Sequence, residues 1–201
     1  MGSREAVRLS TRCRDVIVGT LLGDGCLERN GRRVRLRIDH SIHQNALVDW
    51  KWIEMQELNP LEPKVVSRVD RRTGQTHVNY RFSTRTSCVL EEYFGLFYGV
   101  SGKRLTNRIC DYIVSPLTLA VWYMDDGGRR SDCRIGYLNT NAFTVGEVEV
   151  LKKCLELRFR IPSTTHFAAG RPRIYIAKAH FSDFCEVIRP HVIPEMKYKL
   201  L

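Results

Sequence analysis

The sequence predicts an α+β fold made of two similar halves. Two nine-residue apolar segments that end in Asp-Gly, Ile17–Gly25 and Leu119–Gly127, begin similar successions of predicted elements. Strand-like segments, an amphipathic helix, a hairpin and a closing helix follow each of them, as in an internal repeat. We therefore expect internally duplicated αββαββα halves with pseudo-two-fold symmetry, over residues 1–102 and 103–201, packed as one compact body.

In the first half, the closing glycine of the motif suits the left-handed conformation that ends a helix. The segment Arg33–Asp39 alternates basic and apolar residues, which predicts a half-buried strand. The spacing further predicts a helix over Gln44–Leu58, a hairpin over Lys64–Thr84 that turns at Asp70–Gly74, and a helix near Ser87–Tyr98.

The second half repeats this order. Pro116 is placed to open the motif helix at its first turn, and the closing glycine is again expected to be left-handed. The pattern then predicts a strand over Cys133–Thr140, a helix over Val145–Phe159, a hairpin over Thr164–Lys178 that turns at Ala169–Pro172, and a helix near His180–Ile188.

The composition favours a polyanionic partner. Thirty-two basic and 22 acidic residues leave a net charge of +10, which places nucleic acid ahead of a membrane surface. No apolar run approaches the ~20 residues that span a bilayer, and Met1–Asp15 lacks the apolar core of a signal peptide, so we expect neither membrane insertion nor secretion. The seven cysteines are dispersed, which excludes a zinc site and predicts small core thiols in a reducing compartment.

The motif segments also predict a pair of carboxylates. Gly19 and Gly23 lie on one helix face, where absent side chains permit close backbone approach. If the two motif helices pack side by side, Asp24 and Asp126 lie together at the negative ends of two helix dipoles. Two clustered carboxylates resist joint ionisation unless a cation joins them. Oxygen ligands near a phosphate favour Mg²⁺, and metal-assisted phosphodiester hydrolysis is the chemistry that follows.

Basic residues dominate one face of the predicted first sheet. Arg33, Arg35 and Arg37 face opposite to the apolar residues of their strand, and such a row of like charges is unfavourable unless a polyanion neutralises it. Val78, Tyr80 and Phe82 are expected to face the core, and Arg134, Gly136 and Leu138 to form the sparser face of the second half. The candidate DNA-binding residues are Arg29, Arg32, Arg33, Arg35, Arg37, Lys64, Arg68, Arg71, Arg72, His77, Asn79, Arg81, Arg134, Arg171 and Arg173.

The two motif segments resemble the LAGLIDADG motif, which names a family of homing endonucleases and intron maturases. The flanks of the second motif, Pro116–Gly128 and Leu138–Thr140, and the chain end, Ile188–Pro194 with Tyr198–Leu200, strengthen this resemblance. It extends over nearly the whole chain and favours the monomeric, two-motif branch found in yeast mitochondrial introns. The resemblance implies saddle-shaped antiparallel sheets over the DNA and a site-specific double-strand DNA endonuclease with a long asymmetric target.

Roles for individual residues follow from the same resemblance. It implies catalytic roles for Asp24, Asp126, Lys103 and Lys199, with Lys197 as an alternative to Lys199. Two or more Mg²⁺ ions would be shared between the two aspartates, with Gly23 and Asp125 as adjacent metal-site positions. The role of Asp125 stays open.

Other functions share parts of this pattern. An intron maturase, which binds RNA on the same fold, is the main alternative, and intron RNA is a candidate second partner. A DNA-binding regulator and a non-specific RNA-binding protein explain the duplicated acids less well. Arginine outnumbers lysine, which favours a prokaryotic cytoplasm or nucleoid, with an organelle matrix (mitochondrion or chloroplast) as the other location.

Overall fold

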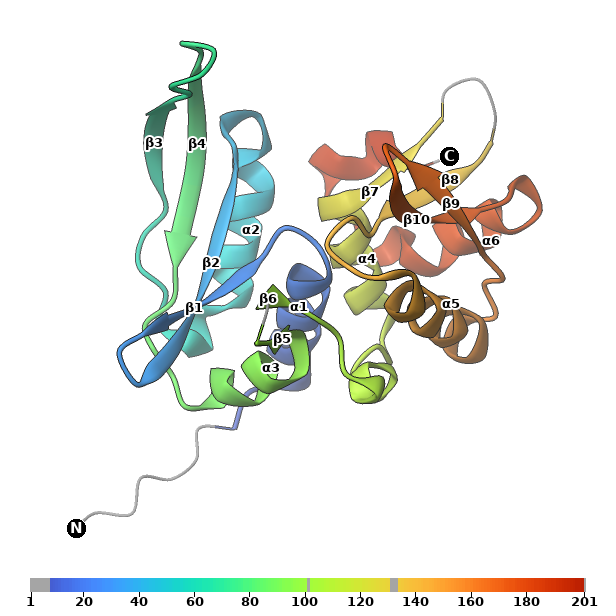
Figure 1. Cartoon of the computed structure of the whole chain (residues 1–201), viewed down its shortest axis with the longest axis horizontal. Helices are drawn as coiled ribbons and strands as arrows, with labels where there is room; N and C mark the ends of the chain where they lie inside the picture. The colour runs from blue at the N-terminus through green and yellow to red at the C-terminus, as the bar shows by residue number, and fades with distance from the viewer. Residues whose placement is uncertain (1–7, 101, 131–133, 201) are drawn as a thin grey trace. The chain divides into compact units, whose positions relative to one another are not determined.

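The computed structural model describes residues 8–100, 102–130 and 134–200 (Figure 1). The chain packs as two compact units, each of which is built from two separate stretches of the sequence. One contains the described residues up to Arg14 and Gly25–Gly95, and the other contains Asp15–Asp24 and the chain from Leu96 onward. Helix α1 (Thr11–Leu22) therefore has most of its length in the second unit.

The first unit is built on a four-stranded antiparallel sheet with the order β1-β2-β4-β3 (Figure 1). Its strands are β1 (Cys26–Asn30), β2 (Arg33–Ser41), β3 (Lys64–Val69) and β4 (Thr76–Ser83). Helix α2 (Asn45–Glu54) packs against β2 and β4, and α3 (Val89–Phe97) ends as the chain enters the second unit. The alternation predicted for β2 is confirmed, since Val34, Leu36 and Ile38 are fully buried.

The second unit repeats this design with a second four-stranded antiparallel sheet of order β7-β8-β10-β9 (Figure 1). Its strands are β7 (Gly127–Arg129), β8 (Gly136–Asn139), β9 (Thr164–Ala168) and β10 (Arg171–Ile176). Besides most of α1, its helices are α4 (Pro116–Asp126), α5 (Val145–Phe159) and α6 (Lys178–Ile188). A two-stranded ribbon, β5 (Tyr98–Gly99) with β6 (Gly102–Lys103), completes the secondary structure. The α+β class and the repeated element order are confirmed.

Capping residues explain several helix boundaries. Ser115 accepts a hydrogen bond from the backbone of Leu117, and Pro116 occupies the first turn of α4 as predicted. Thr144 and Glu147 form a reciprocal capping box at the start of α5, which spans the predicted residues. The helix predicted over Gln44–Leu58 is shorter: α2 ends at Glu54, and Gln56–Leu58 forms a 3-10 turn before left-handed Asn59.

One prediction about side-chain orientation is wrong, and one about burial is only partly right. Strand register places Val78, Tyr80 and Phe82 on one face of β4, as predicted. Of the three, however, only Phe82 is in the core, because Val78 is exposed and Tyr80 is half-buried. In β8, Leu138 is buried, and Gly136 lies against the ring of Phe181. The outward residues of β8 are therefore Tyr137 and Asn139; Cys133, at the start of the predicted strand, lies outside the described residues.

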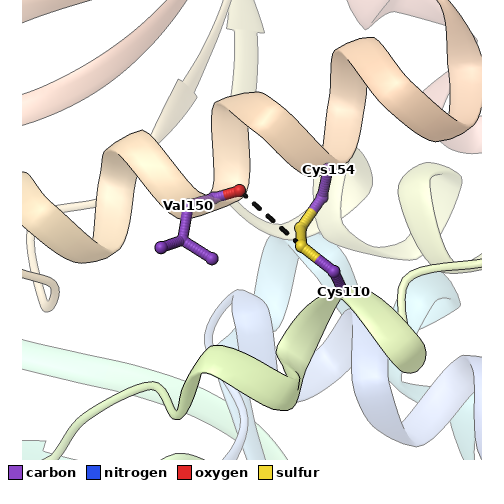
Figure 2. The surroundings of a disulfide bond; sticks show 3 residues. All are labelled: Cys110, Val150 and Cys154. Carbon is purple, nitrogen blue, oxygen red and sulfur yellow. Dashed lines mark hydrogen bonds between the residues drawn. A yellow bond between two sulfur atoms is a disulfide. The ribbon is translucent and has the colours of Figure 1, made fainter.

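The prediction of thiols throughout is wrong for two cysteines. Cys110, in a 3-10 turn before α4, forms a disulfide with Cys154 of α5, although 44 residues separate them in sequence (Figure 2). The fold brings their Cα atoms to 5.4 Å, a distance that suits a disulfide. Sequence spacing alone carries no information on this proximity. Four further cysteines are thiols: Cys13 and Cys185 are buried, as predicted, whereas Cys26 is half-buried and Cys88 is exposed.

The described helices contain no segment long and apolar enough to cross a membrane.

Candidate functional site

The candidate catalytic centre lies where α1 packs closely on α4. The part of α1 that makes this contact belongs, like α4, to the second unit. A methyl group on Gly19 would stand 2.6 Å from the carbonyl oxygen of Thr118 and from Cβ of Val121. One on Gly23 would stand 2.5 Å from Cβ of Asp125. Such distances are well inside van der Waals contact, so the predicted role of the two glycines in backbone approach is confirmed.

Each motif helix ends in a carboxylate at this contact. Asp24 follows α1 and is exposed, whereas Asp126 is the half-buried last residue of α4. Burial raises the pKa of Asp126 to about 7, and the negative charges of Asp24 and Asp125 act in the same direction, while Lys103 and Lys199 oppose it. The five side chains are thus close enough to interact electrostatically, and a cation at Asp126 would favour its ionised form.

Each predicted lysine binds the carboxyl end of a motif helix. The ammonium of Lys103, on β6, donates to the carbonyl oxygen of Gly23 at 2.8 Å. The ammonium of Lys199 donates to the carbonyl oxygens of Met124 at 2.6 Å and Asp125 at 3.3 Å. A cation is favourable at the negative end of a helix dipole, so the fold holds both lysines beside the aspartates.

Tyr123 fixes the segment that carries Lys199. Its hydroxyl donates to the carbonyl oxygen of Lys199 at 2.8 Å, and its ring lies edge-on to Phe184 in the core. A Cβ atom on Gly127 would fall 2.1 Å from the Tyr123 ring. Gly127 is extended, with φ −81° and ψ 155°, so the predicted left-handed conformation is wrong there and close approach is the reason for glycine.

The sequence left the role of Asp125 open, and the structure shows where this residue packs. The residue is only 7% exposed, and its carboxylate packs on Gly23 and accepts a hydrogen bond from the backbone nitrogen of Asp24 at 3.4 Å. Counting back from the closing glycine of each motif pairs Asp125 with Gly23, and this match of a large residue with a small one is the signal that the sequence offers. The carboxylate of Asp125 therefore takes part in the packing between the two motif helices.

In the described ranges, no three acidic, histidine or cysteine side chains converge as a complete metal-ligand set. Mg²⁺ sites that act on phosphates commonly use one or two protein carboxylates together with water and substrate oxygens. The donor set of Asp24 and Asp126 fits that pattern, with the remaining ligands supplied by solvent and a phosphodiester.

A second feature is the outward face of the first sheet, which we call the basic face. Strand register places on it most of the predicted DNA-binding residues of this unit: Arg33, Arg35, Arg37, Lys64, Arg68, His77, Asn79 and Arg81. Arg32 follows the β1–β2 turn residue Gly31, and Arg71 and Arg72 lie in the β3–β4 turn, all exposed. Arg29 is on the opposite face, over the ring of Phe94 and paired with Glu91 at 3.6 Å.

The basic face is not the uncompensated row of charges that the sequence suggested. The carboxylate of Glu28 bonds to both Arg35 and Arg37, and that of Asp39 pairs with Arg81 at 3.9 Å. A hollow of about 340 Å³ opens on this face, and its charged lining residues are the acid Glu62 and the cations Arg35, Arg37, Lys64 and Arg81. The four cations around it suit a phosphate or a base edge.

The corresponding face of the second sheet differs in chemistry. On this face, the guanidinium of Arg173 lies 4.3 Å from the ring centre of Tyr137, and the rings of His166 and Tyr175 stack with their centres 4.1 Å apart. Arg171 and Arg134 are exposed. The outward face of the second sheet thus carries aromatic rings and a cation–π pair, whereas the basic face of the first sheet carries mainly charged side chains.

Comparison with known proteins agrees with this architecture. Residues 14–184 match the LAGLIDADG DNA endonuclease family. The cytochrome b mRNA maturase bI2 of Debaryomyces hansenii is 31% identical over 92% of this chain and 72% of its own length. A probable intron-encoded endonuclease of Wickerhamomyces canadensis is 24% identical over 96% of this chain and 85% of its own length.

Solved structures share the fold. The homing endonuclease I-WcaI bound to its DNA recognition sequence superposes with a TM-score of 0.88 at 24% identity, over 98% of this chain and 88% of that one. I-DmoI in complex with DNA and Mn superposes with a TM-score of 0.51 at 17% identity, over 89% of this chain and 96% of that one.

Proposed function

Since this chain belongs to the LAGLIDADG DNA endonuclease family, we propose that it cleaves both strands of duplex DNA at a long asymmetric target with a divalent metal. The observation that supports this most is the grouping of Asp24 and Asp126 with Lys103 and Lys199 at the ends of two motif helices. A basic sheet face in the first unit supplies the matching surface for a polyanion.

Asp24 and Asp126 would hold the metal, which we propose to be two or more Mg²⁺ ions. When bound, Mg²⁺ polarises a phosphodiester and lowers the pKa of a water molecule. The chain supplies the rest. Asp126 must be ionised, and the neighbouring lysines favour that form. Lys103 and Lys199, already held at the helix ends, are placed to stabilise charge that develops on phosphate oxygens.

The target is expected to be asymmetric because the two outward sheet faces carry different side chains, arginines on the first and stacked aromatic rings on the second. One chain contains both motif aspartates, so we propose that it acts as a monomer. A symmetric dimer would favour a palindrome, whereas a monomer with unlike faces has no reason to.

Selection from a library of randomised duplexes tests this function. Incubation with Mg²⁺, followed by sequencing of the cut ends, is expected to return one long non-palindromic sequence with breaks in both strands. Cutting without any shared sequence, or no cutting at all, would contradict the proposal.

Maturase activity is the second candidate, because a relative 31% identical over most of this chain is a cytochrome b mRNA maturase. RNA binding would use the basic face but would not need the paired acids. Replacing Asp24 and Asp126 by asparagine would then leave splicing of the host intron RNA intact while DNA cleavage is lost. The relatives include yeast proteins and the RecA protein of Mycolicibacterium chitae, so either a prokaryotic or an organellar location fits the proposal.

A further inference from the structure

Glu28 occupies an unusual place for an acid, in the middle of the basic face. Strand register sets it directly opposite Arg35 and one position diagonal to Arg37. Nε and Nη2 of Arg35 donate to Oε2 of Glu28 at 3.0 and 2.9 Å, and Nη1 of Arg37 donates to the other carboxylate oxygen. One carboxylate therefore holds two guanidinium groups at the edge of the 340 Å³ hollow.

This arrangement is not explained by stability of the fold. The side chains of Arg35 and Arg37 are each 38% exposed and that of Glu28 is 24% exposed. Ion pairs at such exposure contribute little to stability. A negative charge on this surface also weakens its attraction for phosphate. Discrimination between DNA sequences by the basic face explains the position of Glu28 better than stability or phosphate attraction does.

Two physical effects favour discrimination. Arginine reads guanine through a planar fork, and a fork that is already oriented loses less freedom on contact with a base edge. A phosphate of an unrelated duplex, in contrast, must compete with the Glu28 carboxylate for each guanidinium. Asp39, on the same face, makes a similar arrangement. Asn79 donates to the Asp39 carboxylate at 2.8 Å, and Arg81 pairs with the same carboxylate.

We propose that Glu28 is a specificity-determining residue, which orients Arg35 and Arg37 for base contacts and suppresses their sequence-independent binding to phosphates. This inference rests on the proposed DNA-binding function. It concerns the ratio of specific to non-specific affinity, which is measured as binding without Mg²⁺.

The test compares Glu28→Gln with the parent on two duplexes, the selected target and a scrambled duplex of equal length and composition. We expect Glu28→Gln to bind the scrambled duplex about tenfold more tightly and to lose about tenfold in the specificity ratio. Release of two guanidiniums to phosphates would also steepen the slope of log affinity against log salt on the scrambled duplex by up to about 1.8, at about 0.9 for each contact.

Glu54→Gln is the matched control. Glu54 belongs to the same unit and binds an arginine, with Nε of Arg12 at 2.6 Å, but it lies on α2 and not on the basic face. It makes the same change in net charge and should leave the specificity ratio unchanged. Thermal unfolding of both variants identifies any loss of folding.

Three results would overturn the inference: a specificity ratio for Glu28→Gln equal to that of the parent, an equal shift in both variants, or an unchanged salt slope on the scrambled duplex. If the parent itself fails to distinguish target from scrambled DNA, it is the proposed function that fails. The two failures are therefore separable.

Discussion

Among single residues, Asp126 is expected to make the stability of the fold depend on pH. Its pKa of about 7 in the folded state lies above the value of about 3.9 expected in the unfolded chain. The folded state therefore binds the proton more tightly. The stabilisation is complete below about pH 4 and is lost as pH rises through 7.

Asp126→Asn should remove this dependence. Without metal, we expect the variant to unfold at a higher temperature than the parent at pH 8 and to differ less at pH 5. Addition of Mg²⁺ should stabilise the parent more at pH 8 than at pH 5, because protons compete for the carboxylate. Thermal unfolding at the two pH values measures both effects. Equal pH responses of parent and variant would exclude the raised pKa.

Lys199 is expected to act on the chemical step and on the end of α4. Lys199→Met should slow single-turnover cleavage by about 10²-fold or more if the ammonium stabilises phosphate charge. It should also cost about 1 kcal/mol in the free energy of unfolding, through the lost bond to Met124. The same change at Lys103 should behave alike, because that lysine binds Gly23.

Lys197→Met provides the control for this pair of effects. Lys197 is exposed and lies two residues from Lys199 in the same 3-10 segment. Near-parental cleavage and stability are expected of it. Slow cleavage by Lys197→Met with parental rates in Lys199→Met would transfer the role to Lys197.

At the scale of elements, the contact of α1 with α4 depends on glycine. Gly19→Ala places a methyl group 2.6 Å from a backbone oxygen of α4, and overpacking of this kind costs about 1–3 kcal/mol. Gly95→Ala, in α3, meets nothing within 4 Å and should stabilise the helix by about 0.5–1 kcal/mol. Chemical denaturation should therefore move the two midpoints in opposite directions. A neutral Gly19→Ala would contradict the close packing.

The disulfide joins α5 to the segment that leads into α4 (Figure 2). Cys110→Ser should lower the free energy of unfolding by about 2–4 kcal/mol under oxidising conditions. Under reducing conditions, it should differ little from the parent. Cys88→Ser, at an exposed free thiol, is the control and should be neutral in both. Equal stability of Cys110→Ser and the parent under oxidising conditions would argue against the bond.

Elements with strong local signals were predictable from the sequence. The period-two pattern of β2 and the capping residues of α4 and α5 fix those elements locally, and the two Asp-Gly motifs located both aspartates. Features set by tertiary contacts were not. Leu138 faces the core because β8 pairs with β10 in that register, and Arg29 leaves the basic face because it lies on the opposite side of β1.

At the scale of the whole molecule, the repeat produces two similar folds with unlike surfaces. The core positions of the two sheets are both apolar, as the buried Leu36 and Ile174 illustrate. The outward positions differ, with Arg35 and Arg37 on one and the Arg173–Tyr137 pair on the other. Folding constrains the buried side chains more than the outward ones, so the outward ones can differ between the two sheets, as the proposed asymmetric target requires.

We propose that Asp24 and Asp126 together support the metal-assisted cleavage of DNA. The most direct test of this proposal is single-turnover cleavage of the selected target with Mg²⁺ by Asp24→Asn and Asp126→Asn, with binding to the same duplex measured in parallel. Each substitution removes a metal-ligating charge at nearly constant volume, so we predict that cleavage falls by at least about 10³-fold while affinity stays within a few-fold of the parent. Cleavage at the parental rate by either variant would contradict the account.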